Sequence, residues 1–69
     1  MEDNTKNKLK AAIAERGLTI RRLSEISGID IQLLYLSVQG KREFRISEVK
    51  KITKALGLDT KERDAIFYD

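Results

Sequence analysis

Apolar residues recur three and four positions apart in five short stretches of the chain, with polar and charged residues between them. Leu9, Ala12 and Ile13 form one such stripe, and no stretch alternates with period two for long enough to predict a strand. Helical spacing of this kind places the apolar side chains on one face of a helix. The pattern therefore predicts an all-α fold, a compact bundle of about five short helices that share one core.

Glycines and small polar residues mark where these helices end and begin. A glycine follows each of the first four apolar stretches, where a helix commonly ends in a left-handed residue: Gly17, Gly28, Gly40 and Gly57. Thr19 and Asp30 are suited to cap the second and third helices, and Asp59 with Glu62 resembles a capping box. The predicted helices cover residues 5–16, 20–27, 31–39, about 45–56, and a segment that begins after Leu58.

The spacing also predicts which side chains form the core. Leu23 and Ile26 are expected to point inward from the second helix, and Phe44 is expected to pack against the body of the protein. Ile66, Phe67 and Tyr68 belong to a last helix that closes the core. The fourth helix has its inward stripe at Ile46, Val49, Ile52, Thr53 and Leu56.

Residues 19–40 have the pattern of a helix-turn-helix. Two short helices are joined by a tight turn at residues 27–30, and Gly28 permits the positive φ that such a turn needs. Ser24 is small enough to let the second of these helices approach closely. Ile29 packs under the turn, and Leu34 anchors the helix that follows.

These residues resemble the lambda-repressor-like, Cro-and-repressor type of helix-turn-helix domain over about three quarters of the chain, from Leu9 to Leu58. The matching residues are Arg16-Gly17-Leu18-Thr19, Leu23, Ser24, Gly28, Ile29, Gly40-Lys41-Arg42 and Lys54-Ala55-Leu56-Gly57. The short length and the Ile66-Phe67-Tyr68 ending are similar to those of small temperate-phage regulators. The resemblance implies a single domain over 1–69 that regulates transcription in a phage-type genetic switch.

The resemblance further implies that the helix at 31–39 enters the DNA major groove. With Leu34 at the centre of the buried face, the opposite face carries two glutamines suited to adenine edges, and a tyrosine and a leucine suited to thymine methyls or sugars. The predicted contacts to bases or to a partner are Ile31, Gln32, Tyr35, Leu36 and Gln39. The predicted phosphate contacts are Arg21, Arg22, Lys41, Arg42 and Arg45. Because one short helix reads few bases, a homodimer on a near-palindromic operator is expected.

Three departures from the family pattern favour a second hypothesis. Ile20 stands where a polar residue is usual, Ser27 and Ser37 replace core aliphatics, and the helix at 31–39 carries no charge. An apolar face with Tyr35 is also typical of a protein interface. The alternative function is therefore an antirepressor, a modulator of repression that binds a partner repressor through this same face and blocks its DNA binding.

Composition narrows these hypotheses further. The 69 residues suffice for one domain, and the net charge of +3 arises mainly between Ile20 and Arg45. The chain has no cysteine and no histidine, so the sequence predicts neither an enzyme nor a cofactor or metal site. No apolar run approaches a membrane span, and a cytoplasmic location without a membrane partner is expected. Residues 1–4 are expected to be frayed.

Overall fold

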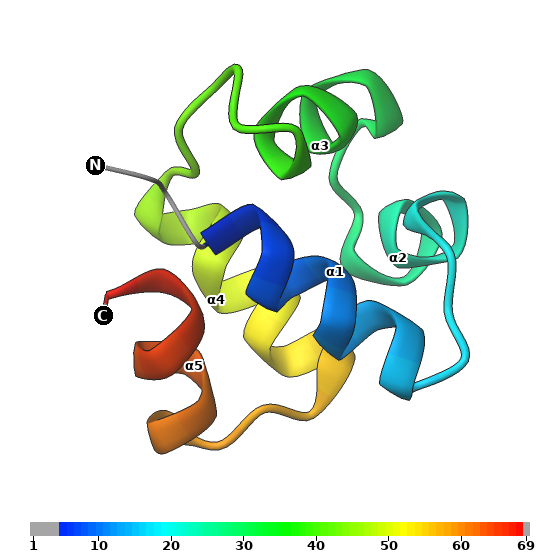
Figure 1. Ribbon diagram of the computed structural model, residues 1–69. Helices are drawn as coiled ribbons and strands as arrows, with labels where there is room; N and C mark the ends of the chain where they lie inside the picture. The colour runs from blue at the N-terminus through cyan, green and yellow to red at the C-terminus, as the bar shows by residue number, and fades with distance from the viewer. Residues whose placement is uncertain (1–4, 69) are drawn as a thin grey trace.

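The computed structural model describes residues 5–68, and the fraying expected at residues 1–4 falls outside this range. Within it the chain forms five helices and no strand: α1 (Thr5–Glu15), α2 (Ile20–Ser27), α3 (Ile31–Val38), α4 (Ile46–Leu56) and α5 (Thr60–Phe67) (Figure 1). The predicted all-α class is confirmed, and the predicted helix limits agree to about one residue. None of the described helices is long and apolar enough to cross a membrane.

The helix ends follow from the capping residues. The Thr19 hydroxyl accepts the Arg22 N–H at 3.1 Å, and the Asp30 carboxylate accepts the N–H groups of the second and third residues of α3. Asp59 and Glu62 form the reciprocal capping box at the start of α5. Gly28 has a φ of 77°, a conformation that L-residues with side chains rarely adopt, and its N–H bonds the Ser24 carbonyl. These predicted caps are confirmed.

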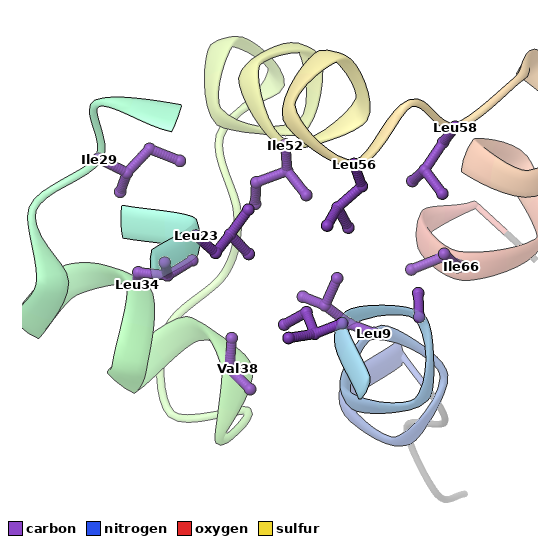
Figure 2. Packing of buried hydrophobic residues seen from close by; sticks show 11 residues of the cluster. Leu9, Leu23, Ile29, Leu34, Val38, Ile52, Leu56, Leu58 and Ile66 are labelled. Carbon is purple, nitrogen blue, oxygen red and sulfur yellow. The ribbon is translucent and has the colours of Figure 1, made fainter. Parts of the chain in front are cut away.

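The core lies where all five helices meet. Leu9, Leu23, Leu34 and Ile52 come from four different helices and have no exposed surface. Figure 2 shows these side chains pointing toward one another, with Ile66 reaching them from α5. Full burial of one such side chain stabilises the fold by about 1.5–3 kcal/mol, so a domain this small depends on each of them.

Helix α5 closes the core at the side of the molecule away from α3 (Figure 1). Ile66 is buried, and the Phe67 ring packs edge-on against Phe44 with centroids 5.4 Å apart. Arg16 ties three helices together, because its Nε donates to the Leu56 carbonyl at 2.6 Å while its Nη2 reaches Glu62 at 3.4 Å. The predicted packing of Phe44 against the body is confirmed.

Three predicted core positions are wrong. Tyr68 is 59% exposed, because it follows the last turn of α5. Ile26 is 41% exposed and lines a hollow with Lys51 and Lys54, because α2 has only two turns and Leu23 makes its inward contact. Ile46 is 70% exposed, since it is the first residue of α4. Side chains on a helix lean toward its N-terminus, so the side chain of a first residue projects past the helix end rather than onto the core.

Candidate nucleic-acid interface

The turn between α2 and α3 is held by two side-chain hydrogen bonds from α2 to Ile29. The Ser24 hydroxyl donates to the Ile29 carbonyl at 2.6 Å, and the Ser27 hydroxyl accepts the Ile29 N–H at 3.3 Å. Ile29 itself is buried beneath the turn. Ser24, predicted to permit the close approach of α3, thus also ties the backbone of the turn to α2.

Helix α3 has one buried face and one exposed face. The buried face consists of Leu34, Ser37 and Val38. The opposite side of the helix therefore faces solvent. Tyr35 is half exposed and Leu36 is 40% exposed, while Gln39 is partly buried at the C-cap. The exposed side chains of α3 are Ile31, Gln32, Leu33, Tyr35 and Leu36. The structure thus brings the predicted contact residues together on one surface, and their role in binding stays a prediction.

Two residues at the start of α3 lie differently from the helical-wheel expectation. Ile31 is three residues before Leu34, a spacing that places it near the buried face of the helical wheel, but it is 42% exposed because, like Ile46, it is the first residue of its helix. Leu33 was not among the predicted contacts, yet it is 41% exposed on the flank that faces α4. The sequence did carry a signal for this exposure: Leu33 is one residue before Leu34, and that spacing places it about a quarter-turn away from the core-facing side.

Four predicted phosphate contacts are exposed cations on the elements that precede and follow α3 in the sequence. Arg21 and Arg22 lie in the first turn of α2, and Lys41 and Arg45 lie in the loop between α3 and α4. Arg22 Nη1 is 3.1 Å from Glu25 Oε1 in a largely exposed ion pair. Exposed cations at such positions can exchange a water shell or a weak pair for a phosphate at low cost.

Arg42, the fifth predicted phosphate contact, is held within the protein. Its Nη1 and Nη2 donate to the two carboxylate oxygens of Glu48 at 3.0 Å and 2.9 Å, and Nη1 also donates to the Ser37 hydroxyl at 2.8 Å. Glu48 also accepts the N–H of Arg45 at 2.9 Å, which caps the start of α4. The Arg42 hydrogen bonds lower the pKa of the Glu48 carboxyl, and Glu48 raises the pKa of Arg42.

The cluster of Ser37, Arg42 and Glu48 therefore joins the end of α3 to the start of α4. It explains the serine at a customary aliphatic position, because a buried hydroxyl there has Arg42 as its partner. Sequence reasoning missed the cluster, although Glu48 at the third position of α4 is a capping-box signal. Ile20, the other unusual residue, is partly buried and packs against the core.

Comparisons with known proteins agree with this geometry. Residues 8–62 match the family of the Cro/C1-type HTH DNA-binding domain. An uncharacterized HTH-type transcriptional regulator of Methanocaldococcus jannaschii is 47% identical over 47 residues, which cover 68% of this chain and 27% of that protein. The aligned part of the chain thus spans about a quarter of the length of that relative. No solved structure matches the chain.

Proposed function

Because the chain belongs to the Cro/C1-type HTH DNA-binding domain family, we propose that it is a sequence-specific transcription regulator that binds operator DNA through α3. The observation that carries the proposal is the exposed face of α3, set on a rigid turn and flanked in the sequence by exposed cations. A helix presented in this way fits the major groove, whose width admits one α-helix.

In this proposal the two kinds of residue have separate tasks. Gln32 and Gln39 hydrogen-bond to base edges, and Ile31, Tyr35 and Leu36 make the apolar contacts. The exposed cations Arg21, Arg22, Lys41 and Arg45 bind phosphates and fix the register of the protein on the duplex. Arg42 as a phosphate contact stays a prediction, and we propose for it a second task, which is to brace α3 against α4 through Glu48.

We further propose that two copies bind a near-palindromic operator, as parts of a phage-type genetic switch. The support is the short recognition helix, because eight residues contact too few base pairs to specify a site in a genome. The aligned residues cover only 27% of the relative, so what the whole regulator senses or assembles with is outside this proposal.

The test is binding to a duplex selected from a random library, followed by fluorescence anisotropy at increasing salt. The logarithm of the affinity should fall against the logarithm of salt concentration with a slope of about −0.9 per phosphate contacted. Arg21→Ala and Lys41→Ala should each reduce the magnitude of that slope by about one unit. Lys61→Ala is the matched control, because Lys61 is an exposed cation on α5 and should leave the slope unchanged. Failure to enrich any duplex at low salt would refute the proposal.

A second function is favoured by one observation, the exposed apolar surface of Tyr35 and Leu36. In this alternative α3 docks on a partner repressor and blocks its DNA binding, as an antirepressor does. Aromatic and aliphatic side chains at the centre of a patch are the usual anchors of protein interfaces. Co-purification with a repressor encoded beside it, lost in a Tyr35→Ala, Leu36→Ala double variant, would support this alternative. Retention of that complex by the double variant would exclude it.

A further inference from the structure

The recognition surface carries no charge on α3 itself. None of the residues from Ile31 to Val38 is acidic or basic, and the only exposed hydrogen-bonding group among them besides the Tyr35 hydroxyl is the Gln32 amide. In the major groove guanine is read chiefly by arginine or lysine at its O6 and N7 acceptors. The cytosine amino group is read chiefly by a carboxylate. Helix α3 offers neither of these chemical groups to a G·C pair.

The nearest arginine in the sequence is also occupied, and the exposed Lys41 beside it is assigned above to a phosphate. Arg42 lies just past the end of α3, but its two terminal nitrogens donate to Glu48 and Ser37. To read a guanine, Arg42 would have to leave both partners and would leave the Glu48 carboxylate, 11% exposed, without its cation. The cluster therefore holds back the arginine nearest to α3, the side chain that binds guanine in a bidentate way.

What α3 does offer is suited to A·T pairs. The thymine C5-methyl is the apolar group at the base edges of the major groove, and branched aliphatic side chains are its natural contacts. Leu36 is 40% exposed at the centre of the outer face, opposite Leu34. Gln32 is its neighbour one turn earlier, and a glutamine amide bonds adenine N6 and N7. A thymine methyl and an adenine edge are the two halves of one base pair.

We infer that the operator is A·T-rich where α3 faces it, and that Leu36 determines specificity by contact with a thymine methyl group. The inference rests on the proposed DNA-binding function and names the chemistry of its target. The exposed cations on the elements before and after α3 complete the match, since they supply the sequence-independent attraction that an uncharged helix lacks.

Replacement of thymine by deoxyuridine tests the inference, because it removes only the methyl group. With the selected operator, deoxyuridine at the contacted position should weaken binding about fourfold, the loss expected for one buried methyl. Leu36→Ala should weaken binding to the thymine operator by a similar factor and leave binding to the deoxyuridine operator unchanged. Thermal unfolding should stay close to that of the unmodified protein, since Leu36 is outside the core.

Leu33→Ala is the matched control. Leu33 is 41% exposed on the same helix, but it lines the hollow toward α4 together with Arg42 and Arg45. Its truncation should weaken binding equally on both duplexes or not at all. Sensitivity to deoxyuridine that depends on Leu33 rather than Leu36 would overturn the assignment.

Other results separate the inference from the function on which it rests. Selection of a site rich in G·C pairs, or equal affinity for thymine and deoxyuridine operators, would refute the inference while the DNA-binding function stands. Failure to bind any duplex, together with capture of a partner repressor through α3, would refute both.

Discussion

Two arginines of this domain, Arg22 and Arg42, each form an ion pair with a glutamate, and the two pairs differ in almost every other respect. Arg22 and Glu25 lie one turn apart on α2, with side chains 60% and 55% exposed and one contact at 3.1 Å. Arg42 and Glu48 belong to different elements, and their side chains are 21% and 11% exposed. Two parallel hydrogen bonds join the second pair, and Ser37 and the Arg45 N–H extend it.

The difference separates a cation that is available to a ligand from one that is committed to the fold. An exposed pair contributes about 0.2–1 kcal/mol, so Arg22 can exchange Glu25 for a phosphate at little cost. Arg42 has a carboxylate and a hydroxyl that depend on it, and their loss would leave polar groups unsatisfied under partial burial. Equal charge in the sequence therefore does not mean equal availability to DNA.

The largest effect on stability is expected from Glu48→Ala. The change removes the acceptor of two Arg42 hydrogen bonds and of the Arg45 N–H that starts α4. We expect the free energy of unfolding to fall by about 2 kcal/mol, from the lost cap and the lost charge-assisted bonds together. Urea denaturation at neutral pH measures it. Glu43→Ala is the control, because Glu43 is exposed in the same loop. An equal loss in both variants would contradict the role of the cluster.

A smaller loss is expected from Ser37→Ala. The serine is 4% exposed, and its hydroxyl accepts a hydrogen bond from Arg42 at 2.8 Å. Removal of that acceptor should lower the free energy of unfolding by about 1 kcal/mol, since Glu48 still holds the guanidinium. Ser47→Ala, at an exposed serine in the first turn of α4, should change it by less. If Ser37→Ala in a Glu48→Ala background costs as much as it does alone, the two contacts are independent and the proposed network is wrong.

The pH dependence of stability should also report on the pair of Arg42 and Glu48. The pKa of Glu48 is lowered in the folded protein by its hydrogen bonds to Arg42, so the folded state favours the ionised carboxylate. The resulting stabilisation is fully present above the ordinary value of 4.5 and is lost as the pH falls through the lower folded value. Urea midpoints measured from neutral pH downward should therefore decline less steeply in Glu48→Gln than in the unmodified protein. Identical declines would show that Glu48 does not contribute.

The two arginines also show how far the sequence alone leads. The caps at Thr19, Asp30 and Asp59 were predictable because each depends on residues two or three positions away. The exposed face of α3 was predictable because helical periodicity fixes which side chains oppose Leu34.

What was not predictable depends on where elements meet or end. The pairing of Arg42 with Glu48 requires the loop between α3 and α4 to bring them together, and residue spacing carries no such information. The exposure of Ile31 and Ile46 depends on which residue begins each helix, because the helical wheel treats every position as interior. For the same reason the sequence assigned Arg42 to a phosphate without showing its internal partners, and that phosphate contact stays a prediction.

The smallest effect on stability is expected from Glu25→Ala. This variant tests most directly whether the exposed Arg22 is available to DNA. Loss of the exposed partner should change the free energy of unfolding by less than about 0.5 kcal/mol. It should nevertheless tighten binding to the selected operator about two- to threefold at low salt, because Arg22 no longer exchanges a carboxylate for a phosphate and one repelling charge is gone. Anisotropy titrations at low and high salt measure the gain in affinity, which should shrink as salt rises.

The control is the same change in an Arg22→Ala background. There the gain in affinity should fall to the part that comes from removing the repulsion between Glu25 and the DNA phosphates. A gain that is undiminished without Arg22 would mean that the exposed arginine does not contact DNA, and that exposure by itself does not identify the phosphate contacts of this domain.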